Sequence, residues 1–217
     1  MKEKFKPFYL VAFLVFSIIA IFIGIFLEIS FGNPQKSKRH YIFQAYYMKK
    51  KFNRPKNYTG VWKEWNKSGE LMVSTQFKDG ILHGEQSVWN ETPNYVYKRQ
   101  LYKYGKLHGK QEYLKSNGTI YFQSIWENGK INGPFIHYYD NSKIKYQEEY
   151  KNGILDGAYN GFYEDGVKKI EGNYKNNKII GDWYFWDKNG KKSKSLNCDN
   201  NVEKEEIIKL LNEFEDE

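Results

Sequence analysis

The sequence predicts an all-β protein: an elongated antiparallel β-meander of stacked 24-residue hairpin repeats, with an N-terminal transmembrane helix and a short C-terminal capping helix. Three observations predict it: a ladder of evenly spaced glycines, one long uncharged segment near the N-terminus, and an acidic amphipathic segment at the C-terminus. We expect four parts: a membrane anchor at 1–30, a basic juxtamembrane linker at 31–57, the β-hairpin repeats at 58–198 and an acidic helix at 199–217.

The expected anchor is the uncharged segment 8–27. Its twenty residues correspond to about 30 Å of helix, enough to cross a bilayer once. A cleaved signal peptide and a buried soluble helix are the alternatives. A signal core is normally about 7–15 residues long and ends in a small-residue cleavage site, which residues 27–31 lack. We therefore favour an uncleaved single-pass anchor.

The positive charge of the chain lies at its N-terminal end. Residues 1–60 contain eleven Lys and Arg against two acids, whereas residues 61–217 contain twenty-three against twenty-four. The basic linker predicts contact with anionic lipids, at about 1 kcal/mol per basic residue, although a stalk that is merely solvated accounts for it equally well. Flanking charge is nearly balanced, with Glu28 favouring a repeat domain outside the cytoplasm.

An internal repeat organises the sequence from residue 60 onward. Its glycines lie 24 or 25 residues apart: Gly60, Gly84, Gly109, Gly133, Gly157 and Gly181. We number repeat positions from each glycine, allowing one inserted residue in the second copy. Position 5 holds Trp65, Trp89, Leu114, Tyr138, Phe162 and Trp186, position 17 holds Phe77, Tyr102, Trp126, Tyr150 and Tyr174, and position 22 holds Leu82, Leu107, Ile131, Leu155 and Ile179. These apolar positions predict the core.

Strands and turns follow from the same repeat. Positions 11, 13 and 17 are apolar with mostly polar residues between them, the alternation of a strand with one buried face. Turn residues recur at two places, at position 9 and at Asp-Gly or Asn-Gly pairs such as Asn128-Gly129 and Asn152-Gly153. Such pairs accept the positive φ of tight hairpin turns. Each repeat is therefore predicted to be a β-hairpin.

The C-terminal segment 199–217 is expected to form a helix. Asp199 can cap it, and its apolar residues gather toward one side: Val202, Ile207, Leu210, Leu211 and Phe214. We interpret it as a cover for the exposed edge of the sheet. A partner-binding helix and a frayed acidic tail are the alternatives.

The repeat resembles the bacterial variant of the MORN repeat. The closest copies run from Gly109 to Gly133 and from Gly133 to Gly157, and residues 150–157 are the best single match. The resemblance covers about residues 58–194. It implies a scaffold or membrane-associated binding module, and it also implies an antitoxin-like component of a toxin–antitoxin system. Asn141-Ser142, Asn177 and an insertion around Pro93 depart from the pattern and put local turn geometry in doubt.

Candidate catalytic and metal-binding residues are few, and we predict no catalytic, cofactor-binding or metal site. His83 and His108 share one repeat position and should lie about 10 Å apart, too far to share one metal ion. His137 lies on an aromatic strand, and His40 lies in the basic linker. Cys198 is the single cysteine, which excludes an intrachain disulfide and a thiolate metal cluster.

The remaining motifs also argue against catalysis. Residues 105–110 lack the spacing of a phosphate-binding loop. Glu148 and Glu149 are adjacent, so on a strand they face opposite sides and cannot act as a carboxylate pair. Nucleic-acid binding needs a basic groove, which the nearly neutral repeats do not provide.

The sequence therefore predicts a non-enzymatic, membrane-anchored scaffold that engages a protein or a cell-envelope component, without a cofactor and without nucleic acid. The alternative is an antitoxin-like protein that neutralises a partner toxin by direct binding.

Overall fold

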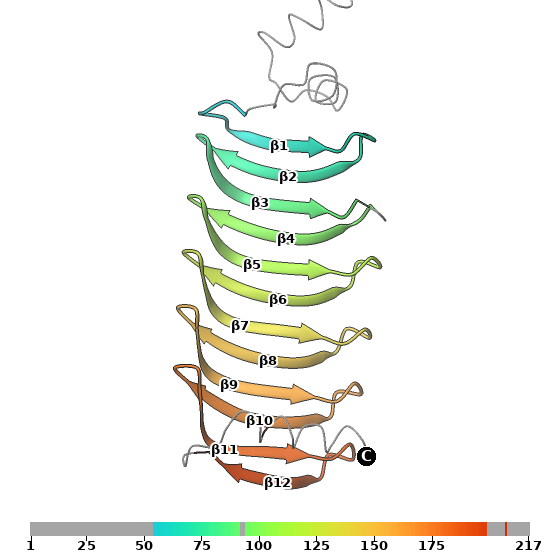
Figure 1. Ribbon diagram of the computed structural model, residues 1–217, viewed down its shortest axis with the longest axis vertical. Coiled ribbons are helices and arrows are strands. Elements are labelled where there is room, and N and C mark those ends of the chain that lie inside the picture. The colour runs from blue at the N-terminus through green and yellow to red at the C-terminus, as the bar shows by residue number, and fades with distance from the viewer. Residues whose placement is uncertain (1–53, 92–93, 199–206, 208–217) are drawn as a thin grey trace, which may run out of the picture.

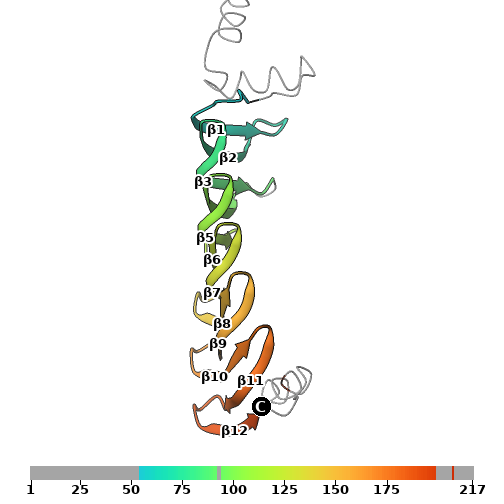
Figure 2. The same ribbon diagram turned by 90° about the vertical axis from the view of Figure 1, so that its left-hand side faces the viewer.

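The computed structural model describes residues 54–91, 94–198 and 207. They form one twelve-stranded antiparallel sheet in which every strand pairs with its neighbours in the sequence, from β1 to β12 (Figure 1). Seen from its side, the stack is a single layer of strands (Figure 2). The strands are β1 Gly60–Trp65, β2 Leu71–Lys78, β3 Ile81–Trp89, β4 Val96–Lys103, β5 Lys106–Leu114, β6 Ile120–Glu127, β7 Lys130–Tyr138, β8 Ile144–Lys151, β9 Ile154–Phe162, β10 Lys168–Lys175, β11 Lys178–Trp186 and β12 Lys192–Asn197.

Tight turns connect each even-numbered strand to the next odd-numbered strand, and all of these turns lie along the same side of the sheet, where the strands end. Their central residues have positive φ, as in Asn128 (50°) and Gly129 (86°), which is the geometry expected of Asn-Gly hairpins. Each turn also bonds to the start of the strand that follows the preceding turn: the amide of Gly129 donates to the carbonyl of Leu107 on β5 at 2.8 Å, and the amide of Gly153 donates to the carbonyl of Ile131 on β7 at 2.8 Å. The turn pairs predicted from the sequence therefore link successive repeats.

Register shifts recur at the same repeat positions and place equivalent residues in line. On β8, for example, Tyr146 lies opposite His137 and Ile144 lies opposite Tyr138, so that Lys145 is the extra residue of a bulge. A bulge adds one residue to one strand and increases local twist. Because each repeat contributes two strands with the same shifts, its side chains form rows that run across the sheet.

The cluster of buried apolar side chains that pack together lies at the C-terminal end of the sheet. It consists of Ile170, Trp183, Phe185, Cys198 and Ile207, each between 0% and 4% exposed. Gly172 makes room for this packing, since a Cβ there would come within 2.1 Å of the Trp183 ring. Cys198, the single cysteine, is therefore buried in the folded chain.

The residues at repeat positions 5 and 17, which the sequence predicted as core, do not belong to this buried cluster. Trp126 and Tyr150 at position 17 are half-buried, and of the position-5 residues only Leu114 is fully buried, at 8% exposure. Residues at positions 17 and 5 lie on opposite faces of the sheet. Trp126, at position 17, lies on the same face as Ser124 and His137. Tyr138, at position 5, directly follows His137 and therefore faces the other side. A single-layer sheet with side chains on both faces cannot bury either of these two sets of residues completely.

The expected fold class was wrong in its helical parts. The described residues contain strands but no helical element, and no helix among them is long and apolar enough to cross a membrane. The segments expected as a transmembrane helix, 1–30, and as a capping helix, 199–217, lie outside the described residues except for Ile207. Apolar length and helical spacing are local properties, whereas this architecture arises from strand pairing, which requires neither helix.

Candidate binding face

A row of stacked rings crosses the middle of the sheet on one face. Tyr113, Phe122, His137 and Tyr146 lie directly opposite one another on β5, β6, β7 and β8. Their ring centroids are 4.3, 6.3 and 5.1 Å apart in that order, with interplanar angles of 24°, 12° and 5°. Aromatic pairs of this kind contribute about 0.5–1.5 kcal/mol each beyond their burial.

A second row runs beside the first on the same face. Phe135 stacks on Phe122 with centroids 5.3 Å apart, and Tyr159 lies 6.0 Å from Tyr146. We call the surface formed by both rows the aromatic face. Its members are Tyr113, Phe122, Phe135, His137, Tyr146 and Tyr159.

The aromatic face arises from the repeat and from strand pairing together. Tyr113 and His137 occupy position 4 of their repeats, whereas Phe122 and Tyr146 occupy position 13. Pairing alternates these two positions across β5 to β8, so residues 9 or 15 apart in sequence become ring neighbours. Position 4 was not singled out from the sequence, because it carries aromatic residues in only some repeats.

The titratable rings of His137, Tyr146 and Tyr159 on the aromatic face are uncharged near neutral pH. Burial lowers the pKa of His137 below its usual value of 6.5, and the charges of Lys145 and Lys115 lower it further. Burial likewise raises the pKa values of Tyr146 and Tyr159 above 10. The imidazole and the phenols therefore remain neutral.

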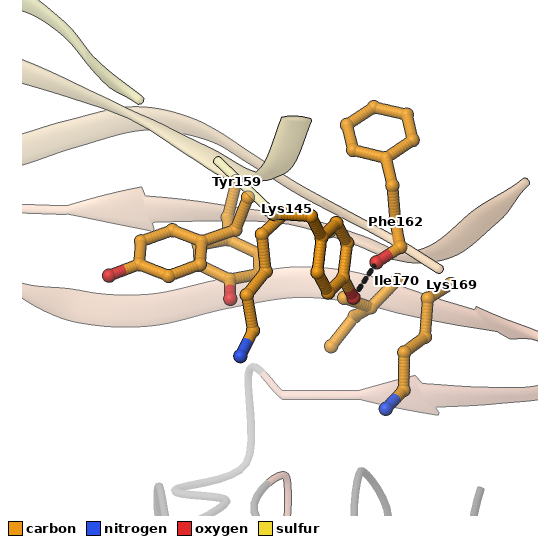
Figure 3. Close-up of a pocket in the computed structure, with 8 residues that line it drawn as sticks. Lys145, Tyr159, Phe162, Lys169 and Ile170 are labelled. Atoms are coloured by element: carbon orange, nitrogen blue, oxygen red, sulfur yellow. Dashed lines mark hydrogen bonds between the residues drawn. The ribbon is translucent and has the colours of Figure 1, made fainter. Parts of the chain in front are cut away.

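A pocket of about 100 Å³ opens at the end of the aromatic face, over β8, β9, β10 and the turn that precedes β8 (Figure 3). Its lining residues are Tyr139, Lys145, Tyr146, Tyr159, Gly161, Phe162, Lys169 and Ile170. Lys145 and Lys169 extend in the same direction on either side of Ile170. Both lysines are the extra residues of bulges at repeat position 12. The alternation of apolar and polar residues in the sequence does not predict that they line one pocket.

A tyrosine hydroxyl fixes one side of this pocket, and the next repeat has an equivalent contact. The Tyr139 hydroxyl donates to the carbonyl of Phe162 at 2.7 Å, and the equivalent Tyr163 hydroxyl donates to Trp186 at 2.7 Å. The Lys145 ammonium lies 5.5 Å from the centroid of the Tyr139 ring. Such contacts contribute about 0.5–1 kcal/mol at exposed sites and also orient the ammonium group.

Toward the N-terminal end, a polar ladder replaces the rings on the same face. Gln86 donates to Thr75 at 2.9 Å, Gln100 donates to Gln86 at 2.5 Å, and Gln111 donates to Gln100 at 2.9 Å. Thr75, Gln100 and Gln111 are only 4–7% exposed. The groups that bond one another in this ladder do not offer a site for an outside ligand.

The histidines considered in the sequence take two different places in the described residues, and His40 lies outside those residues. His83 and His108 lie near the starts of β3 and β5, and His83 packs edge-on against Tyr104 with centroids 5.3 Å apart. His137 belongs to the aromatic face. Within residues 54–91, 94–198 and 207, no group of three or more His, Cys, Asp or Glu side chains is arranged to hold a metal ion.

Glu148 and Glu149 face opposite sides of β8. Glu148 lies opposite Phe135 and Tyr159 on the aromatic face, whereas Glu149 lies opposite Pro134 and accepts a hydrogen bond from Gln147 at 3.1 Å. The two carboxylates do not form a pair.

Comparison with known families matches three hairpins of this sheet. Residues 58–79, 131–152 and 155–176 each match the model of the MORN repeat variant. These segments correspond to the hairpins β1–β2, β7–β8 and β9–β10. No curated protein matches the chain. The chain is therefore a repeat protein that is similar to the MORN repeat variant in three of its hairpins.

Proposed function

We propose that this chain is a non-catalytic binding module that engages a protein partner through the aromatic face. Three matches to a repeat variant support a repeat module without catalytic chemistry. The observation that carries the proposal is the stacked row from Tyr113 to Tyr146 on the face of a single-layer sheet. Half-buried rings of this kind are enriched where proteins meet, because they offer large contact areas.

The size and chemistry of the face suit a segment of polypeptide. Four strands spaced about 4.8 Å apart give the row a length of about 15 Å, comparable to several residues of an extended chain or three turns of a helix. Lys98 lies 5.2 Å from the Tyr113 ring centroid at one end of the row, and Lys145 lies at the other end. An apolar segment with acidic side chains at its ends fits this arrangement.

Site-specific photo-crosslinking tests the proposal. A photoreactive residue at Tyr121, which is 39% exposed and packs edge-on against Phe122 and His137, should capture the partner in cells. The same residue at Gln123, which faces the other side of β6, is the matched control. The product from position 121 should disappear when Phe122→Ala is introduced. Equal products from both positions, or a product of twice the chain mass, would contradict a partner bound to this face.

An antitoxin-like role is a narrower form of the same proposal. Its support is the sequence resemblance, and it requires the partner to be a toxin encoded nearby. Co-expression of the chain with a neighbouring toxic reading frame should then restore growth, and Phe122→Ala should abolish the rescue. A rescue that survives loss of the aromatic face would separate the antitoxin role from this binding site.

For localisation, we propose association with a membrane, with the repeat domain outside the cytoplasm. Its support is the uncharged and basic composition of residues 1–56, which lie almost entirely outside the described residues. Fractionation of cells with salt and carbonate washes tests it. Recovery of the chain in the supernatant before any wash would contradict it.

A further inference from the structure

One hairpin turn departs from the others in the row. Repeat position 19, which opens the turn after each even-numbered strand, holds Asp79, Asn128, Asn152 and Asn176 in four copies but Tyr104 in the second. All five have positive φ, and that of Tyr104 is 48°. Asp and Asn tolerate this left-handed conformation, whereas in a bulky residue it is strained. Tyr104 therefore occupies a position for which its side chain is poorly suited.

The Tyr104 side chain is not buried by its surroundings. It is 70% exposed, and Ile81 on the neighbouring turn is 49% exposed. A Cβ atom on Gly105 would lie 3.6 Å from Cγ2 of Ile81, which places the Ile81 side chain beside the Tyr104 turn. The His83 ring meets the Tyr104 ring edge-on, with centroids 5.3 Å apart. The tip of hairpin β4–β5 therefore presents an aromatic and an aliphatic side chain to solvent.

Two lysines of like charge flank the same turn. Lys103 and Lys106 lie directly opposite each other at the ends of β4 and β5, and both are exposed. Like charges placed opposite each other destabilise a strand pair. Within residues 54–91, 94–198 and 207, neither ammonium group takes part in a salt bridge. Their repulsion is therefore not offset by an acid.

Equivalent turns do offset such charge. Glu127 lies opposite Lys130 at the ends of β6 and β7. Lys175 lies opposite Lys178, but its ammonium group binds the carboxylate of Asp156 at 3.0 Å. The uncompensated pair of lysines is therefore a feature of the Tyr104 turn and not of the repeat.

Three unfavourable features thus coincide at one hairpin tip: a strained aromatic residue, exposed apolar side chains and two like charges. Backbone strain gathers at functional sites, and exposed apolar groups ringed by polar residues mark interaction sites. We propose that this tip binds an acidic segment of a protein. One carboxylate of the segment lies between the Lys103 and Lys106 ammonium groups, and a neighbouring apolar side chain packs against Tyr104 and Ile81. This surface is separate from the aromatic face.

A narrow protein segment fits the charges better than a flat anionic membrane does. The turns on this side of the sheet lie in one row (Figure 1), with successive turns roughly 10 Å apart. A flat surface resting on Tyr104 therefore also meets Asp79 and Glu127, the exposed acids of the two neighbouring turns. A segment of a few residues can contact the lysines without approaching those acids.

A labelling scheme isolates this turn in the full chain. Tyr104 and Gly105 form the only Tyr-Gly pair in the sequence, so ¹³C-carbonyl tyrosine combined with ¹⁵N glycine gives a single NMR signal from the Gly105 amide. The purified chain is titrated at constant ionic strength with the peptide acetyl-Leu-Glu-Leu-amide. Acetyl-Leu-Gln-Leu-amide is the neutral control, and glycerol phosphate represents a lipid headgroup. We expect a saturable shift with the Glu peptide and none with the Gln peptide.

Lys106→Gln and Lys178→Gln form a matched pair of variants, since both residues occupy repeat position 21. Lys106→Gln should weaken binding of the Glu peptide about threefold, as expected for one exposed ion pair. Lys178→Gln should leave binding unchanged.

Tyr104→Asn installs the residue that three other copies carry. It removes the strain together with the ring, so it should raise the melting temperature by about 2 °C and still weaken binding of the Glu peptide about fivefold. The Gly105 signal of this variant is followed with ¹³C-carbonyl asparagine. A purely structural tyrosine would not combine a gain in stability with a loss of binding.

Four outcomes would overturn the inference: no saturable shift with the Glu peptide, equal weakening by the two lysine variants, tighter binding of glycerol phosphate than of the Glu peptide, or unchanged binding in Tyr104→Asn. Tighter binding of glycerol phosphate would indicate a lipid headgroup in place of a protein. Crosslinking at position 121 reports on the aromatic face, so its success or failure is independent of these titrations.

Discussion

The imidazole of His137 stacks on the phenol ring of Tyr146, with ring centroids 5.1 Å apart and an interplanar angle of 5°. The two residues lie opposite each other on β7 and β8. His137 thereby becomes part of a row of stacked rings. Its Nδ1 atom is buried without a hydrogen-bond partner, which disfavours adding a proton to the ring.

The first prediction concerns the pH dependence of this contact. The pKa of His137 in the folded chain is below 6.5, so the unfolded chain binds the additional proton first as the pH falls. The stability contributed by neutral His137 is fully present above about pH 6.5 and is lost as the pH falls toward the folded-state pKa. Urea unfolding between pH 5 and 8 should show this loss, and His137→Phe should reduce it. A histidine pKa at or above 6.5 by NMR titration would contradict the prediction.

The second prediction compares a buried ring with a half-buried one. Phe185 is 0% exposed, so Phe185→Ala should lower the free energy of unfolding by about 3–5 kcal/mol. Trp126 is half-buried, so Trp126→Ala should lower the free energy of unfolding by only about 1–2 kcal/mol, because only part of the indole side chain is removed from water in the folded chain. Denaturant unfolding of the two variants measures the difference. An equal or larger loss for Trp126→Ala would place the main core in the middle of the sheet.

The third prediction exchanges residues between two equivalent turns. Ser142 and Gly166 both occupy position 9, with φ of 66° and 94°, and their amides donate to Tyr139 and Tyr163 at 3.0 and 2.9 Å. Ser142→Gly should raise the unfolding free energy by about 0.5 kcal/mol, since relief of left-handed strain exceeds the added chain entropy. Gly166→Ser should lower it by about 1 kcal/mol. Thermal unfolding of both variants tests the pair, and a shift in the same direction for both would refute it.

The fourth prediction concerns the polar ladder. Gln100 is 4% exposed and bonds with both Gln86 and Gln111. Gln100→Ala leaves those neighbours without their partner and should cost about 1–3 kcal/mol. Gln123→Ala, on the opposite face of β6, is the control and should stay within about 0.5 kcal/mol. Comparable losses for the two variants would show that the ladder adds nothing beyond side-chain size.

Much of the repeat architecture was predictable from local chemistry. Asp79-Gly80, Asn128-Gly129 and Asn152-Gly153 form the positive-φ turns expected of them, because such pairs tolerate that conformation wherever they occur. The departure at Ser142 did not alter the turn, since the flanking strands hold its backbone at a φ of 66°. The interval of the glycines likewise predicted the hairpin period of the sheet.

The sequence by itself determined the all-β class, the hairpin repeat and the residues at its turns, because these depend on spacing and on backbone preference within a few residues. Only the tertiary structure decided which side chains became neighbours. Register shifts placed Tyr113, Phe122, His137 and Tyr146 in one row and brought Lys145 and Lys169 to one pocket. A shift of one residue moves every following side chain to the other face of a strand, so the binding face depends on strand pairing that no single repeat specifies alone.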